Sequence, residues 1–138
     1  MSIRPATPAD IPRLMEIREA VRENRLSDPK VVPASDYCEF IAHSGIWVWE
    51  EFGQILGFSA GDTRSGWVWA LFVDPPYERR GIGRALLPEA CASLRRAGHQ
   101  ILKLSTAPGT RAERFYLADG WRPAGRSASG EIVFEKVG

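Results

Sequence analysis

Features that mark secreted, membrane-embedded or nucleic-acid-binding proteins are scarce in this sequence. It has 2 cysteines in 138 residues, too few for the disulfide framework of a small secreted domain. No apolar run approaches the roughly 20 residues that cross a bilayer, and the N-terminal segment lacks the apolar centre of a signal peptide. The net charge is +1, so there is no basic excess for general binding to nucleic acid or membrane surfaces. We therefore expect a cytoplasmic protein with neither kind of partner.

What is present favours one ordinary globular domain spanning residues 1–138. Apolar residues make up 44% of the chain and charged residues 25%, as in typical globular domains. Cys38 and Cys91 both fall in apolar helical patterns, so we expect both to be buried free thiols. His43 and His99 lie at the ends of predicted helices without the spacing of metal ligands, and we expect no metal cofactor.

The most informative segment begins with an unbroken apolar run, residues 67–73. The absence of polar alternation is typical of a central strand covered by helices on both faces. The run ends at Asp74, and a basic segment with two glycines then leads directly into an apolar helical pattern. A strand that stops at such a turn and restarts as a helix presents free N–H groups at the positive end of the helix dipole. With three arginines beside it, this turn predicts a site for a phosphorylated ligand.

The other patterns predict an α/β domain with a mixed, mostly antiparallel sheet of about seven strands and four helices. Ser35 is the expected N-cap of the second helix. We expect Trp47/Trp49 and Trp67/Trp69 to pack across strands in the core rather than to form an aromatic cage. The expected order is β-α-α-β-β-β-α-β-α-β-β, with strands at 2–6, 46–50, 55–60, 67–73, 101–105, 121–124 and 131–137, and helices at 8–21, 36–43, 81–97 and 111–119.

Three short motifs occur along the chain, and their order is informative about its family. Residues 78–83 read Glu-Arg-Arg-Gly-Ile-Gly, and residues 71–75 before them read Leu-Phe-Val-Asp-Pro. Further on, Phe115-Tyr116 is followed by Gly120-Trp121. In these motifs the whole chain resembles the GNAT superfamily of acyl-CoA-dependent N-acyltransferases, whose cofactor loop follows [Q/R]-x-x-G-x-[G/A] after a central strand. A Rossmann site fits less well, and the Gly-Lys-Ser/Thr of a Walker loop is absent.

The resemblance implies that acetyl-CoA enters the sheet between the fourth and fifth strands. Its pantetheine arm would bond the backbone of the fourth strand, and its pyrophosphate would sit on the N–H groups of the turn, with arginines adding charge. Glu78 departs from the family's Gln or Arg, and we expect it to point away and pair with an arginine on the next turn. The implied cofactor-binding residues are Leu71, Phe72, Val73, Arg79, Arg80, Gly81, Ile82, Gly83 and Arg84.

The resemblance also implies direct attack of an amine on the thioester in a ternary complex. Tyr116 matches the family's general acid, which protonates the departing thiolate; packing in the core is its other interpretation. The acid that several family members carry early in the fourth strand is missing here. The amine would therefore be deprotonated through water or by a residue elsewhere, for which Asp62, Glu50 and Glu51 are weak candidates.

Acceptor recognition in this family falls to the first two helices and their connection. Here that connection is polar, and its residues either line an acceptor pocket or form a solvated loop. The acceptor would be a small-molecule or peptide amine, and the terminal hairpin is a candidate contact for a homodimer. A different-class alternative is an acyl-CoA-binding sensor or assembly module with vestigial catalysis. The candidate acceptor residues are Arg22, Asn24, Arg25, Asp28 and Tyr37.

Overall fold

The computed structural model describes residues 1–23 and 32–137, and within these ranges the predicted order of elements is confirmed. The strands are β1 (Ser2–Pro5), β2 (Trp47–Glu51), β3 (Gln54–Asp62), β4 (Trp67–Val73), β5 (Ile101–Thr106), β6 (Arg122–Arg126) and β7 (Ile132–Val137). The helices are α1 (Ile11–Glu23), α2 (Ala34–Ala42), α3 (Ile82–Arg96) and α4 (Arg111–Ala118), with short 3-10 turns η1 (Pro8–Asp10) and η2 (Pro75–Tyr77).

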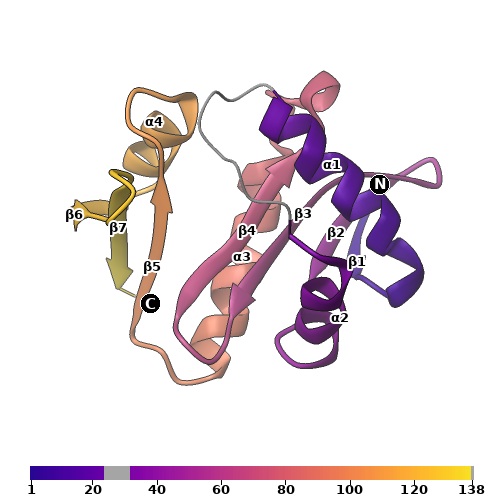
Figure 1. The fold of residues 1–138 in the computed structure, drawn as a ribbon, viewed down its shortest axis with the longest axis horizontal. Helices are drawn as coiled ribbons and strands as arrows, with labels where there is room; N and C mark the ends of the chain where they lie inside the picture. The colour runs from indigo at the N-terminus through magenta and orange to yellow at the C-terminus, as the bar shows by residue number, and fades with distance from the viewer. Residues whose placement is uncertain (24–31, 138) are drawn as a thin grey trace.

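The strands of the described residues form one sheet in the order β1-β2-β3-β4-β5-β7-β6. Neighbouring strands are antiparallel except β4 and β5, which are parallel because α3 crosses between them. Figure 1 shows α1 and α2 on one face of the sheet and α3 on the other. The apolar run of β4 is thereby explained, because this central strand packs against helices on both sides.

A capping box formed by Thr7 and Asp10 starts η1, which leads directly into α1. The backbone N–H of Thr7 donates to the Asp10 carboxylate at 2.8 Å, and Pro8 occupies the first position of η1. Arg4 on β1 binds the same carboxylate at 2.9 Å and Glu50 on β2 at 3.1 Å. One arginine therefore ties the start of the helix to two strands, and it holds the pKa of Asp10 below its ordinary value.

An extra residue in β4 changes the side on which its side chains lie. Ala60 of β3 pairs with Ala70, and the next residue, Gly61, pairs with Val68, so Trp69 has no partner on β3. Trp69 and Ala70 consequently both pack into the cluster beneath α1 and α2, while Val68 and Leu71 pack toward α3. The bulge turns the end of β4 relative to its beginning, at the point where β4 leaves β5.

Several local expectations are wrong. Pro33, not Ser35, is the N-cap residue of α2, so Ser35 lies inside the helix. Cys91 is buried as expected, but Cys38 is exposed because it lies on the outer side of α2. Core packing of Trp47, Trp49 and Trp69 is confirmed. The pairs of β2 and β4 do not meet each other, however, since β3 lies between them. Trp69 instead stacks on Phe40 of α2 with ring centroids 3.9 Å apart.

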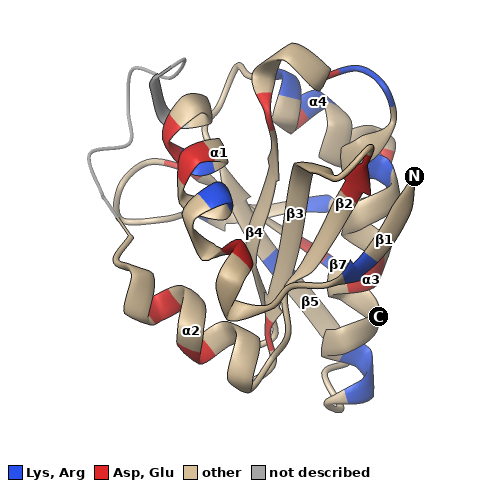
Figure 2. Ribbon diagram, turned by 90° about the vertical axis from the view of Figure 1, so that its right-hand side faces the viewer, with Lys and Arg blue, Asp and Glu red and all other residues tan. Residues whose placement is uncertain are grey.

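Charges of both signs occur on the helices of the described residues. Figure 2 shows acidic residues on α2, both signs on α1 and basic residues at the end of α3. No helix within the described ranges has the length and apolar character needed to cross a membrane.

Asp10→Asn is expected to lower the free energy of unfolding by about 1 kcal/mol at pH 7, because it weakens both the capping box and the contact with Arg4. A carboxyl whose pKa is lowered on folding stabilises the protein above its unfolded pKa of about 3.9 and loses that contribution as the pH falls further. Urea unfolding at pH 7 and near pH 3 should therefore show the difference shrinking in acid. Glu89→Gln on α3 is the control, and an equal loss at both pH values would contradict the assignment.

Candidate functional site

A cleft opens where β4 and β5 separate. The two strands pair at one position, Trp67 with Lys103, and then diverge toward their C-terminal ends (Figure 1). A cavity of about 1000 Å³ occupies this region. Its walls come from β4 after Trp67, the end of β5, the turn and first residues of α3, α4 as far as Tyr116, and Val21 of α1.

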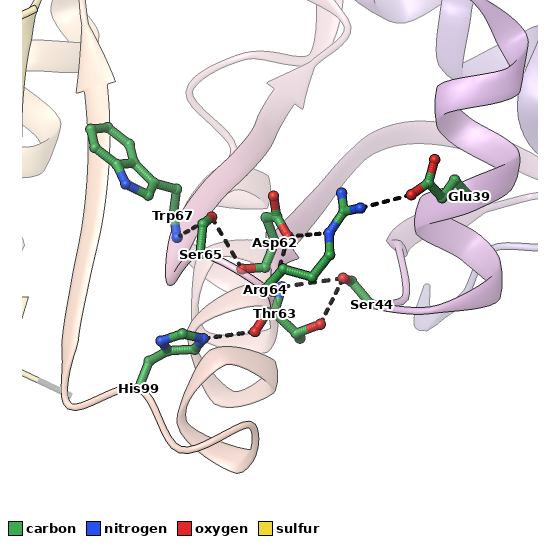
Figure 3. A network of polar contacts seen from close by, with 8 residues as sticks. All are labelled: Glu39, Ser44, Asp62, Thr63, Arg64, Ser65, Trp67 and His99. Carbon is green, nitrogen blue, oxygen red and sulfur yellow. Dashed lines mark hydrogen bonds and ion pairs between the residues drawn. The ribbon is translucent and has the colours of Figure 1, made fainter.

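The closed end of the cleft is held by a polar network, shown in Figure 3. His99, between α3 and β5, bonds the carbonyl of Thr63 through Nε2 at 2.7 Å, and because a carbonyl oxygen accepts, Nε2 carries the proton. The backbone N–H of Lys103 donates to the carbonyl of Gly66 at 3.1 Å. Gly66 has φ +84°, and a Cβ there would lie 3.0 Å from Nδ1 of His99, so this turn favours glycine. The hydroxyl of Thr63 also bonds the hydroxyl of Ser44, which follows α2. This bond connects the closed end of the cleft to the segment after α2.

The backbone at the end of β4 faces the cleft at alternate residues. The N–H of Asp74 donates to the carbonyl of Leu56 on β3 at 2.9 Å. Because successive residues of a strand turn their polar groups to opposite sides, those of Phe72 also face β3, and those of Leu71 and Val73 face the cleft. The residues expected to hold a pantetheine arm by their backbone are thus the two that present an unpaired strand edge.

The turn between β4 and α3 lines the same cleft. Gly81 precedes the first helical residue with φ +83°, and Arg79 also has a left-handed backbone, with φ +66°. The N–H of Ala85 donates to the carbonyl of Gly81 at 3.1 Å, so helical bonding begins there. The N–H groups of Ile82, Gly83 and Arg84 therefore have no acceptor within α3, as an anion site at a helix N-terminus requires.

The charged side chains of this turn differ in their partners. Arg80 binds Glu51 of the β2–β3 hairpin at 2.9 Å. For Arg79 and Arg84, which are exposed, no side-chain partner is found among residues 1–23 and 32–137. The predicted pairing of Glu78 with an arginine on the next turn is wrong. Glu78 instead binds Arg111 at the start of α4, at 3.1 Å. This ion pair joins the two sides of the cleft.

The opposite wall is built by β5 and α4. Thr110 caps α4 through its hydroxyl, which accepts from the N–H of Glu113 at 3.2 Å, as its capping-box sequence predicts. Tyr116 lines the cleft and is 7% exposed, with its ring against Phe115, Trp121 and Phe134. The tyrosine expected as general acid therefore lies in the same cleft as Leu71 and Val73 and is also part of the core.

The candidate acceptor residues are only partly placed by the structure. Asn24, Arg25 and Asp28 lie outside the described residues, and Arg22 belongs to the last turn of α1. Tyr37 is fully buried beneath the sheet-facing side of α2 and is not among the residues that line the cleft.

The three candidate bases are all engaged in ion pairs, and the arginine that holds Glu51 itself lines the cleft. Asp62 binds Arg64, Glu50 binds Arg4, and Glu51 binds Arg80. None of the three acids is among the lining residues. Among the residues that the structure describes, no group of three His, Cys, Asp or Glu could hold a metal ion.

A family model for the GNAT acetyltransferases matches residues 11–121, which include the cleft from β4 through Tyr116. The chain belongs to the GNAT acetyltransferase family. The predicted family and fold are thereby confirmed.

Individual GNAT proteins are similar to the chain to different extents. The peptidyl-lysine N-acetyltransferase YiaC of Escherichia coli is 44% identical over 48 residues, which cover 35% of this chain and 32% of that protein. The ribosomal-protein-alanine N-acetyltransferase of Brucella melitensis has a TM-score of 0.80 and 21% identity, covering 99% of both chains. The Salmonella typhimurium protein yncA, solved with its cofactor acetyl-CoA, has a TM-score of 0.82 and 20% identity, covering 99% of this chain and 93% of its own.

Sequence reasoning missed two features of this cleft. The ion pair of Glu78 with Arg111 joins residues far apart in the chain, and no local pattern signals it. Arg18 lies on the buried stripe of α1, beside the aromatic residues of β4 that line the cleft. Its helical spacing with Leu14 and Val21 is the one signal that could have identified it.

His99→Ala should open the closed end of the cleft by removing the bond to the Thr63 carbonyl. We expect the free energy of unfolding to fall by about 1 kcal/mol and the amide of Lys103 to exchange its hydrogen faster than in the wild type. His43→Ala at the exposed end of α2 is the matched control. Unchanged exchange at Lys103 would show that His99 does not hold the strands together.

Proposed function

We propose that this protein transfers the acetyl group of acetyl-CoA to a primary amine by direct attack within a ternary complex. The observation that carries the proposal is the cleft between β4 and β5, where an unpaired strand edge and a helix N-terminus face one cavity. An acyl thioester with a pyrophosphate needs both features, one for the extended arm and one for the anion.

The chain's own groups fit this cosubstrate at both ends. The backbone polar groups of Leu71 and Val73 would bond the arm as an added strand. The N–H groups of the α3 N-terminus would bind the pyrophosphate, with Arg79 and Arg84 free of partners among the described residues to add charge-assisted bonds. Arg80 would also bind the phosphates, either in place of Glu51 or together with it. The wall residues Phe72, Gly81, Ile82 and Gly83 complete the proposed site.

The chemistry follows from this placement. The neutral amine attacks the thioester carbonyl, forming a carbon–nitrogen bond as the carbon–sulfur bond breaks. The N–H of Val73 faces the cleft and would donate to the developing oxyanion, whereas that of Phe72 faces β3. Tyr116 would give its proton to the departing thiolate, and the amine would lose its proton to water.

Water is proposed as the proton acceptor because the cleft offers no suitable carboxylate. Glu78 is the one carboxylate among the described residues lining the cavity, and Arg111 holds it. The same observation favours a second candidate function, an acyl-CoA-binding sensor or assembly module with vestigial catalysis. The acceptor in the proposed reaction is a small molecule or a peptide; the names of two similar proteins, which specify a peptidyl lysine and an alanine of a ribosomal protein, support the peptide.

Ligand protection and turnover together test the proposal. Acetyl-CoA should raise the midpoint of thermal unfolding, with a stabilisation of about 2.7 kcal/mol at 100 times its Kd. ATP and NAD at the same concentration should give no shift. A thiol-release assay with a panel of amines then separates the two functions: tight binding of acetyl-CoA without turnover of any amine would favour the sensor.

Tyr116→Phe removes the hydroxyl of the proposed general acid and keeps the ring in its aromatic cluster. We expect kcat to fall on the order of 100- to 10,000-fold while acetyl-CoA still protects against heating. Tyr77→Phe is the matched control, because Tyr77 also lines the cleft but has no assigned role in transfer. Full activity of Tyr116→Phe would refute the general-acid role.

Glu78→Gln should strengthen the binding of acetyl-CoA by about two- to fivefold at low salt. The substitution removes a negative charge beside the proposed phosphate site and releases Arg111. Isothermal titration at two salt concentrations measures the change, which should shrink as salt rises. Glu89→Gln is the control, and weaker binding by Glu78→Gln would mean that this carboxylate supports the site.

A further inference from the structure

Arg18 is an arginine of α1 that turns toward the sheet instead of the solvent. Its Nε and Nη1 atoms are buried and have no hydrogen-bond partner. The other arginines of this region are paired: Arg4 binds Asp10 and Glu50, and Arg13 binds Asp74 at 2.7 Å. Arg18 therefore differs from its neighbours: the residue is half-buried, and two of its guanidinium nitrogens are buried without a partner among the described residues.

Aromatic rings form the walls around the guanidinium. Its central carbon lies 4.7 Å from the centroid of Phe72 and 5.8 Å from that of Trp69. Trp69 is the extra residue of the β4 bulge. Its ring stacks on Phe40 and meets the ring of Tyr37 edge-on, with the centroids of Trp69 and Tyr37 5.4 Å apart. The ring faces offset part of the cost of burying the cation, but they accept no hydrogen bond in the plane of the guanidinium.

Tyr37 supplies a second buried polar group without a partner. Its hydroxyl is unpaired, and its residue is fully buried. Burial raises the pKa of Tyr37, while the nearby positive charge of Arg18 acts in the opposite direction, as expected for two groups close together. Nearly all buried polar groups in proteins have partners, so two adjacent ones without any indicate a ligand.

Arg18 and Tyr37 are not themselves among the residues that line the cleft, but neighbours of Arg18 are. Trp69 and Phe72 line the cleft, as does Val21, one helical turn after Arg18. Phe72 lies between Leu71 and Val73, whose backbone groups face the cleft. A molecule that reaches Arg18 would thus contact the front face of β4 at the level of the proposed thioester.

We propose that Arg18, assisted by the hydroxyl of Tyr37, binds a carboxylate of the acceptor, so that the substrate is an amino carboxylic acid. This inference rests on the acetyl transfer proposed above. A carboxylate neutralises the buried guanidinium and accepts several of its N–H bonds at once, which a neutral acceptor does not do. Arg18 is a specificity-determining residue in this assignment, and the amine at the other end of the substrate is the group that is acetylated.

Matched acceptors test the assignment with the wild type. Lysine is compared with lysinamide and with cadaverine, which keep the amine and lack the negative charge. Ornithine is compared in the same way with putrescine. We expect kcat/KM to be at least about tenfold higher for the carboxylates, mainly through KM. A lysine peptide with a free or an amidated C-terminus distinguishes a free amino acid from a peptide carboxylate as the source.

The variants separate recognition from stability. Arg18→Met should remove the preference for carboxylates, lower their kcat/KM by on the order of tenfold or more, and leave lysinamide and the KM of acetyl-CoA unchanged. Arg18→Lys keeps the charge and the stem, should fold if Arg18→Met does not, and should retain part of the preference. Arg95→Met on the exposed end of α3 is the control. Equal losses for lysine and lysinamide, or a wild type without preference, would overturn the inference.

A binding measurement keeps this inference separate from the proposed function. If acetyl-CoA binds but no amine is turned over, the transfer activity is refuted on its own. Thermal protection of the acetyl-CoA-loaded protein by lysine, but not by lysinamide, would still show the carboxylate site. Arg18→Lys should weaken this protection by lysine. Equal protection by lysine and lysinamide would contradict the role of Arg18 whatever the activity.

Discussion

The cleft depends on the single backbone pairing between β4 and β5. Trp67 and Lys103 are in register, and beyond them the strands diverge, so the end of β4 keeps an unpaired edge inside the protein. Such an edge is normally paired or covered, because free N–H and C=O groups away from water are costly. The His99 contact and the glycine turn at Gly66 hold the strands together at one end, which allows them to separate at the other.

The bulge at Trp69 connects this backbone arrangement to side-chain recognition. By adding one residue to β4 it turns the polar groups of Leu71 and Val73 toward the cleft and places Trp69 on the face of α1 and α2. One irregularity thus serves both sides of the proposed reaction. The acyl donor would meet the backbone of β4, and the acceptor would meet the aromatic rings that surround Arg18.

Six arginines of the chain form two groups that differ in their partners, whereas Arg80 and Arg111 are paired and also line the cleft. Arg4, Arg13 and Arg64 are held by carboxylates and connect helices to strands, so they act in the fold. For Arg18, Arg79 and Arg84 no carboxylate partner is found within the described ranges, and all three lie beside the cleft or on its wall. A net charge of +1 conceals this separation, because composition does not record which charges are paired.

Local sequence determined the elements and the glycine turn of this protein, since periodicity, caps and an unbroken apolar run act over a few residues. Gly81 at the start of α3 and the capping box of Thr110 are of this kind. Tertiary structure alone decided the contact of Glu78 with Arg111, the burial of Tyr37 and the unpaired state of Arg18. These depend on which distant residues the sheet order brings together, and a helical stripe shows that a residue faces inward without showing whether a counter-ion meets it there.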